Sequence, residues 1–388
     1  MSYLHKIENK TVDFTNKYAT LILLFLLILI SISFFYGWYF DSTKPVSGTG
    51  WADQTLYTKT AKTLAYFEKP TKHMFHFQMG YAILGALFYR IMPQDPFMLV
   101  SLFLLLGSVT LIFHGMKRIT NTLLASFLII LLFIWDLKGS TFNYPSELFI
   151  IPWNNQVPFF TFSYLFWLIT NDSDEIKSLK VVILTGIICG FCVATREETI
   201  LFILPMVIIL FVYRKLSLVK LILCLCLFVI AYAPQPIIKH FIFQSITAKG
   251  RHSDLTYVEY LMRYINIRRF FSNLKTVIID ARLSSVPWDE IRRKALFQSS
   301  PWLWLSIPGL FFIFALKKNF QIKLLTVFAL MLFVFYVSGP NMNEKKLKFH
   351  CIRYISASLI MFNYSIINLL KIVYERIKRS VNVQAVDY

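Results

Sequence analysis

Three residues spaced four apart form the first pattern in the chain that has the types and spacing needed for chemistry. Asp53, Tyr57 and Ala61 would share one face if this stretch is helical, because residues four apart lie above one another on an α-helix. A carboxylate in the first turn of a helix is also favoured by the helix dipole. Asp53 is therefore either an ordinary N-terminal acid of a solvated juxtamembrane helix or part of a site at the membrane surface.

Charged residues also interrupt two later apolar stretches. Glu147 follows a turn-favouring Tyr-Pro-Ser sequence that begins at Tyr144, so it could start a helix or point into a cavity. Arg196 and Glu197 interrupt an apolar hairpin. Ionisable residues at membrane depth are costly and tend to face a partner or a polar cavity, whereas a hairpin tip at the interface would leave them solvated. Both alternatives stay open for this hairpin.

Positive charge gathers at two further places. Arg353 and Tyr354 open the last apolar run, where they could contact a phosphate or anchor the helix at the membrane interface. The segment 237–300 carries 11 Lys and Arg against 5 Asp and Glu, and it includes Arg268 and Arg269. This balance would suit an anionic lipid-linked substrate, an acidic glycan or lipid headgroups.

The elements that must position these residues are membrane helices. Of the 388 residues, 56% are hydrophobic and only 16% are charged, whereas a soluble domain is about 25% charged. Mean hydropathy is +0.58, and apolar runs near the roughly 20 residues that cross a bilayer recur along the whole chain. The sequence therefore predicts an all-α polytopic membrane protein that forms a single domain over residues 1–388.

We expect about ten spans with both termini in the cytoplasm. The expected spans are residues 19–39, 97–115, 123–135, 157–169, 181–194, 200–211, 221–233, 302–316, 324–337 and 355–370. Every short loop that this topology places in the cytoplasm contains Lys or Arg, as the positive-inside rule requires. The basic segments 40–95 and 237–300 are then outside, where the rule is weak because both are long. The apolar piece 81–92 is too short to span and is expected to lie along the outer interface.

Other chemistries find little support in the sequence. His73 and His76 have no third metal ligand near them, and the chain contains neither a Walker loop nor a G-x-S-x-G motif. Four cysteines lie inside apolar runs, where they are expected to act as packing residues: Cys189, Cys192, Cys224 and Cys226. Nucleic acid is not an expected partner, because the basic segments face outward.

The stretch around Asp53 resembles the first outer loop of GT-C superfamily glycosyltransferases. The shared pattern is Asp-x3-Tyr-x3-Ala-x2-Leu after a first membrane span. In that family an acidic pair opens the helix, and a Pro-rich turn leads into a short apolar helix. Here Gln54 replaces the second acid, and residues 77–81 stand at the turn without a proline. The first departure weakens any inference of a metal, so no metal ligand is assigned and a divalent cation is left open as a cofactor.

Three later segments are similar to motifs of the same family. Glu147 lies in a Tyr-x-Ser-Glu segment like the second acidic motif of bacterial members. Arg196 lies in a segment that the family places near the lipid phosphate, although Glu197 stands where the family often has proline. Arg353 and Tyr354 match an Arg-Tyr pair at the last span. The resemblance covers most of residues 20–215 and 350–370, and segment 237–300 has no counterpart.

The resemblance implies a glycosyltransferase similar to the protein mannosyltransferase and aminoarabinose transferase type. It would move a sugar from a polyprenyl-phosphate donor to a glycan, lipid or protein acceptor, with inversion at the anomeric carbon. Asp53 would be the general base and Glu147 would assist it. The residues expected to bind substrate are Tyr57, Tyr144, Arg196, Glu197, Arg268, Arg269, Arg353 and Tyr354.

Two functions of other kinds remain as alternatives. A transporter or flippase for lipid-linked glycan would place charge deep in the spans and break helices near the bilayer midplane. A glycan polymerase or ligase would place its essential groups in segment 237–300. The Phe-, Ile- and Lys-rich composition favours a bacterial inner membrane, with the site on the periplasmic face.

Overall fold

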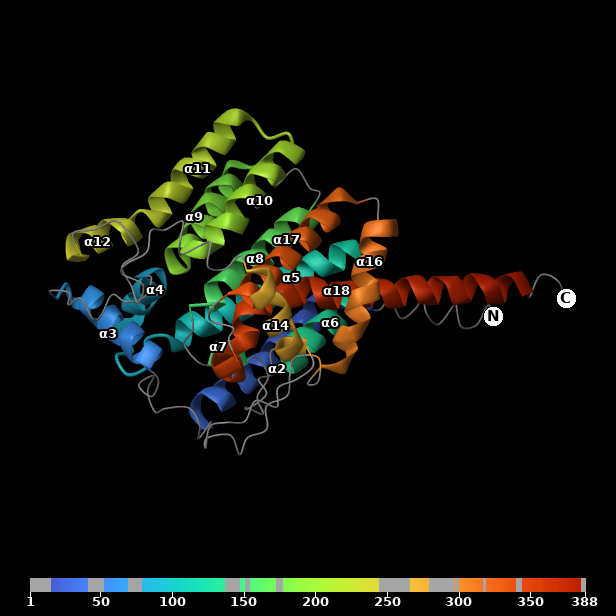
Figure 1. The fold of residues 1–388 in the computed structure, drawn as a ribbon, viewed down its shortest axis with the longest axis horizontal. Coiled ribbons are helices and arrows are strands. Elements are labelled where there is room, and N and C mark those ends of the chain that lie inside the picture. Colours follow the sequence, from blue (N-terminus) through green and yellow to red (C-terminus); the bar gives the residue numbers. More distant parts are fainter. Residues whose placement is uncertain are drawn as a thin grey trace.

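The computed structural model describes most of the chain as a bundle of helices (Figure 1). The described residues are 15–40, 52–68, 79–136, 147–150, 154–171, 177–243, 266–278, 297, 300–316, 319–339 and 344–384. Within these ranges the chain forms helices and turns and no β-strand. The all-α membrane bundle expected from the sequence is confirmed at this level.

Among the residues that the structure describes, five stretches of helix are long and apolar enough to cross a bilayer. They are Ala19–Tyr39 in α2 (Ala19–Phe40), Met98–Ile119 forming α5, Leu218–Ile238 in α11 (Leu218–Tyr232) and the start of α12 (Pro234–Phe243), Phe320–Ser338 forming α17, and Ile355–Ile377 in α18 (Glu344–Gln384). Each coincides with one of the expected spans. Their outward positions are apolar, for example Phe25 on α2 and Val229 on α11, as a surface facing lipid requires.

Five other expected spans are also helical but shorter. They correspond to α6 with its π-helical continuation η3 (Thr122–Ile129 and Ile130–Asp136), α8 (Gln156–Thr170), α9 (Leu179–Thr195), α10 (Ile200–Tyr213), and η6 with α16 (Pro301–Leu305 and Ser306–Leu316). Helix α10 has 14 residues, which at about 1.5 Å per residue is about 21 Å, less than a hydrocarbon core of about 30 Å.

The interior of the bundle is built around α18. Every residue from 355 to 369 is buried, and this part of α18 packs against α8, α16 and α17. A Cβ at Gly309 of α16 would overlap the backbone oxygen of Ser365, so α16 and α18 approach closely. The C-terminal end of α18 projects beyond the bundle (Figure 1).

Two glycines bring α9 against α11. A Cβ at Gly186 would lie 2.5 Å from the carbonyl oxygen of Cys224, and one at Gly190 would overlap the carbonyl oxygen of Phe228. This Gly-x3-Gly spacing places both glycines on one face and lets the backbones approach closely, as in other membrane helix pairs. We call this contact the glycine seam. Three cysteines on these helices are buried as expected, whereas Cys226 is exposed on the outer side of α11.

Two short helices lie beside the end of α9. Helices α3 (Ala52–Tyr66) and α4 (Met79–Tyr89) pack on each other, and α4 also contacts α9. A Cβ at Gly80 would lie 2.7 Å from the backbone carbon of Ala194, so the first turn of α4 presses against the last turn of α9. Figure 1 shows α3, α4 and α12 together at this end of the molecule.

Hydrogen bonds at the opposite end join several loops. The Arg214 Nη2 donates to the backbone oxygens of Ile169 and Asn171 at 3.0 and 2.8 Å, which joins the ends of α8 and α10. The Thr122 hydroxyl donates to Asn16 Oδ1 at 2.7 Å, which joins the start of α6 to the segment before α2. Loops that the expected topology assigns to one side therefore meet in pairs at one end of the bundle.

Candidate functional site

The turn between α9 and α10 is a buried polar feature, which we call the hairpin tip (residues 195–199). Helix α9 ends because Arg196 adopts an extended conformation with φ −150° and ψ 95°, and the 3₁₀ turn η5 (Glu197–Thr199) then leads into α10. Thr195 and Thr199 stabilise the turn by donating to the backbone oxygens of Cys192 and Arg196, each at 2.6 Å. All five residues of the tip are buried, so the tip is not a solvated turn at the membrane surface.

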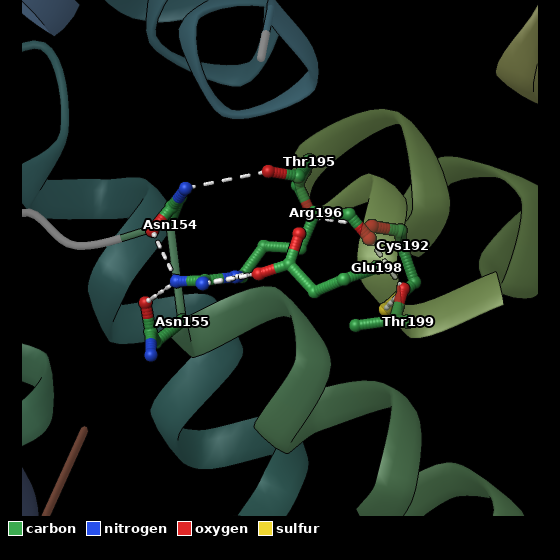
Figure 2. A network of polar contacts seen from close by, with 7 residues as sticks. All are labelled: Asn154, Asn155, Cys192, Thr195, Arg196, Glu198 and Thr199. Atoms are coloured by element: carbon green, nitrogen blue, oxygen red, sulfur yellow. Dashed lines mark hydrogen bonds and ion pairs between the residues drawn. The ribbon is translucent and has the colours of Figure 1, made fainter. Parts of the chain in front are cut away.

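Arg196 is the centre of this site (Figure 2). Its Nε donates to Glu198 Oε1 at 2.7 Å, and its Nη2 forms an ion pair with the same oxygen. Its Nη1 donates to the side-chain oxygens of Asn155 at 2.6 Å and Asn154 at 3.4 Å. The guanidinium also lies over the ring of Tyr336, with 5.6 Å between its carbon and the ring centroid. Arg196 is only 8% exposed, and its guanidinium is thus contacted from three sides.

Among the described residues of the tip, two acidic side chains lie beside one arginine. Glu197 and Glu198 are 4% and 1% exposed, so two carboxylates are buried beside one guanidinium. The second oxygen of Glu198, Oε2, has no hydrogen-bond partner among the described residues. Buried ions are costly unless they are paired and hydrogen-bonded, so a cluster of this kind is more than is needed to close a helix hairpin.

Gln235 connects the tip to the α3–α4 pair. Its Nε2 donates to Glu197 Oε1 at 3.0 Å, and its Oε1 accepts the backbone N–H of Met79 at 2.5 Å. Met79 is the first residue of α4, so its N–H has no acceptor within the helix and needs one from outside. A single fully buried amide therefore joins α12, the hairpin tip and the start of α4.

An apolar cavity begins next to Arg196. Its walls come from α8, α10, α17 and α18, and its volume is about 30 Å³ for a water-sized sphere. The polar lining is Asn155, Thr199, Tyr336 and Ser356, of which Asn155, Thr199 and Tyr336 also contact Arg196. The remaining lining is hydrophobic: Pro158, Phe159, Phe162, Leu165, Phe202, Ile203, Met206, Phe328, Leu332 and Ala357. The buried cation is therefore held by residues that form part of the wall of a small apolar cavity.

A second group of hydrogen bonds centres on Gln156, the residue that follows Asn155 in the chain. Gln156 Oε1 accepts from Tyr81 at 3.0 Å and from Ser101 at 2.9 Å, while its Nε2 donates to the backbone oxygen of Leu148 at 3.0 Å. These partners come from α4, α5 and the short helix α7 (Glu147–Ile150). Residues 154–156, which we call the amide segment, thus contact both the hairpin tip and helices α4, α5 and α7.

The described residues place several predicted site residues around this segment. Tyr57 is 3% exposed, and its ring packs edge-on against Tyr81 with centroids 5.3 Å apart. Asp53 lies in the first turn of α3, and Glu147 begins α7, whose next residue accepts the bond from Gln156. Arg353 lies in α18 two residues before its buried part. The side chains of Asp53, Glu147, Arg353 and Tyr354 lie outside the described part of the structure, as do Tyr144, His73 and His76 entirely.

Arg268 and Arg269 lie apart from the tip, on a separate helix, α14 (Ile267–Ile278). Arg268 is exposed, while Arg269 is partly buried and its backbone N–H donates to Asn266 Oδ1 at 2.9 Å. Asn273 of the same helix donates to the backbone oxygen of Val337 at 2.7 Å, next to Tyr336. Helix α14 is therefore attached near the site through Asn273.

The sequence did not indicate the neutral residues that bond to Arg196 and Glu197 at the hairpin tip. Asn154, Asn155 and Gln235 are uncharged, and they lie in stretches that were interpreted as loops. The signal present was three consecutive amide side chains before an apolar run and a glutamine between two prolines. Within the described ranges, no group of three or more His, Cys, Asp or Glu residues is placed to hold a metal ion.

No known family of protein sequences matches this chain, and no curated protein is significantly similar to it.

Proposed function

We propose that this chain is a membrane glycosyltransferase of the GT-C type, which transfers a sugar from a polyprenyl-phosphate donor to a glycan, lipid or protein acceptor. The observation that carries the proposal is the buried Arg196 held at the polar end of an apolar cavity. A polyprenyl phosphate combines the same two chemistries in one molecule, an apolar chain and an anionic head. The resemblance of the Asp53 and Arg196 segments to that superfamily supports the same function.

In this proposal the phosphate binds Arg196 on its Nη1 side. Glu198 Oε1 accepts from Nε and forms an ion pair with Nη2, whereas Nη1 donates to the neutral side-chain oxygens of Asn154 and Asn155. A phosphate oxygen is a stronger, charge-assisted acceptor than an amide, and Asn155 already lines the cavity. The phosphate replaces the amides while the Glu198 ion pair keeps the guanidinium in place.

The acceptor is activated from the α3–α4 pair. Asp53 accepts the proton of an acceptor hydroxyl as its oxygen attacks the anomeric carbon, and the bond from that carbon to the donor phosphate oxygen breaks. Arg196 then stabilises the negative charge on the departing phosphate. Contacts through Gln235 and Gly80 support this arrangement, because they fix α4 and its partner α3 against the hairpin tip.

The other predicted residues take supporting roles in the proposal. Glu147 assists Asp53 or orients the acceptor, and Glu197 positions the tip through Gln235. The remaining contacts to donor or acceptor are assigned to Tyr57, Tyr144, Arg268, Arg269, Arg353 and Tyr354.

The topology proposed for this function has about ten crossings with both termini in the cytoplasm. The shorter helices α6–η3, α8, α9, α10 and η6–α16 supply the five crossings beyond the five long ones. The hairpin tip then faces the periplasm of a bacterial inner membrane. Because α10 is shorter than a bilayer core, the tip lies below the outer surface, within reach of a lipid-linked donor.

A lipid-linked glycan transporter is the second candidate, and one observation favours it. Buried ionisable groups on short membrane helices, such as Arg196 and Glu198, also mark transport pathways. The transporter moves its substrate without breaking the sugar–phosphate bond, so the two functions differ in whether that bond is cleaved. A glycan polymerase or ligase remains the third candidate.

The proposal is tested with Asp53→Asn in the native host. Loss of a general base lowers turnover by about 100-fold or more. We expect one sugar to be lost from surface glycans and its lipid-linked donor to accumulate, at unchanged protein level by immunoblot. Asp95→Asn is the matched control, because Asp95 is a partly exposed acid in the turn that follows α4. Unchanged glycan in Asp53→Asn would overturn the mechanism, and intact donor trapped on the cytoplasmic side would favour the transporter.

A further inference from the structure

Helix α14 has two unlike faces. Phe270, Asn273 and Leu274 are buried or partly buried against the bundle, and they follow the i, i+3, i+4 spacing of a single helix face. On the outward side Ile267 is 74% exposed and Phe271 is 64% exposed, one turn apart. Two large apolar side chains so exposed need an environment other than water if the face is to be stable.

The depth of α14 is fixed by its attachment to a membrane-spanning helix. Asn273 Nδ2 donates to the backbone oxygen of Val337, the second-last residue of the candidate span Phe320–Ser338. Val334 lies one turn earlier on α17, is 43% exposed and faces outward. Helix α14 is therefore held within about one turn of a lipid-facing residue, at the level where the span ends.

The orientation of α14 and the position of its arginine are both consistent with a helix that lies at the end of the span. Figure 1 shows α14 lying across α18, which it contacts, rather than alongside it as a further span. With 12 residues it is about 18 Å long, too short to cross a bilayer. Arg268 is exposed next to Ile267, so a cation lies beside the exposed apolar pair.

We propose that α14 is an interfacial helix that rests on the bilayer, with Ile267 and Phe271 inserted at the boundary of the acyl chains and Arg268 bound to the phosphates of anionic lipid headgroups. Apolar residues on one side of a short helix with arginine beside them are the arrangement that binds this boundary. The proposal does not depend on the transfer reaction. It gives Arg268 a partner in the bulk membrane when no sugar donor is bound.

The insertion is tested in the full-length protein in lipid nanodiscs without any sugar donor. p-Acetylphenylalanine replaces Phe271, or Phe270 in the matched control, and each is labelled with a ketone-reactive nitroxide so that the native cysteines stay in place. Electron paramagnetic resonance then gives the collision rate of the label with oxygen, which concentrates in lipid, and with a water-soluble nickel chelate. We expect the label at 271 to collide with oxygen in preference to nickel, and the label at 270 to be shielded from both.

Two outcomes would overturn the insertion. Preferential collision with nickel at 271 would place this face in water. Shielding from both reagents at 271 as well as at 270 would mean that a protein surface, such as a second copy of the chain, covers the face.

The headgroup contact is tested with the same label at 271. Anionic phosphatidylglycerol is titrated into zwitterionic nanodiscs, with and without Arg268→Gln. A basic residue at the surface contributes about 1 kcal/mol, so Arg268→Gln should raise the anionic fraction needed for half of the spectral change about fivefold. Lys371 is an exposed lysine in the C-terminal half of α18, and Lys371→Gln should leave this anionic fraction unchanged. A spectrum that does not respond to anionic lipid would overturn the headgroup contact of Arg268 and leave the apolar insertion standing.

Discussion

Helix α9 is held in its middle and at its C-terminal end by opposite kinds of contact. Through its middle, Gly186 and Gly190 bring its backbone against that of α11, with no polar side chain involved. At its C-terminal end, five residues around Arg196 are buried with charges and hydrogen bonds that reach α8, α12 and α17. The glycine seam joins two helices by shape alone, whereas the hairpin tip joins four elements through groups that water would otherwise solvate.

This difference indicates which part of α9 could respond to a ligand. The closely packed backbones at the glycine seam cannot exchange one contact for another, so this contact is either formed or broken. A guanidinium can exchange a neutral amide acceptor for a phosphate while keeping its ion pair. In the proposed function, the rigid contact in the middle of α9 therefore supports an exchangeable contact at its C-terminal end.

Removing the cation at the tip should have the largest effect. Arg196→Met leaves Glu198 buried without its partner, and an uncompensated buried charge costs about 3–5 kcal/mol. The free energy of unfolding would be measured by titrating the purified protein in mild detergent with SDS. The double variant Arg196→Met with Glu198→Leu removes both charges and should recover most of the loss. A loss below about 1 kcal/mol in the single variant would show that the pair behaves like a solvated surface ion pair.

Adding one methyl group to the glycine seam should have the next largest effect. Gly190→Ala places a Cβ on the backbone oxygen of Phe228, which cannot move without shifting α11, so we expect a loss of about 1–3 kcal/mol in the same titration. Gly107→Ala is the matched control. There the new Cβ would meet only the ring edge of Phe160, a partly exposed side chain that can rotate away. Equal losses in both variants would mean that the seam is no tighter than an ordinary helix contact.

The helices could be predicted from the sequence because apolar runs of this length have few other uses. The run predicted at 157–169 is α8 at Gln156–Thr170, and the run predicted at 181–194 is α9 at Leu179–Thr195. Arg196 was identifiable for a related reason, since a charge between two apolar runs is costly wherever it lies. The sequence left open whether it was solvated, and the structure buries it.

The partners of Arg196 could not be predicted, because an amide side chain looks the same in a solvated loop and in a buried site. Asn155 is 41 positions from Arg196, and Gln235 is 156 positions from the Met79 N–H that it accepts. Separations of this size depend on how the helices pack, and hydropathy carries no information on that. The clue that remains in the sequence is local: Asn154, Asn155 and Gln156 stand together at the start of an apolar helix.

The smallest effect should come from a neutral hydrogen bond at the polar end of α9. Tyr81→Phe removes the donor to Gln156 Oε1 but leaves the ring stacked on Phe97, with centroids 4.8 Å apart. Ser101 still donates to the same oxygen at 2.9 Å, so no buried acceptor loses its last partner. We therefore expect a loss of about 0.5–1.5 kcal/mol, the usual net contribution of one hydrogen bond. The double variant Tyr81→Phe with Ser101→Ala strips both donors from the oxygen and should cost more than the two single losses added together. Simple additivity would show that Gln156 turns its amide to another donor, and that this neutral network is as exchangeable as the contacts of Arg196.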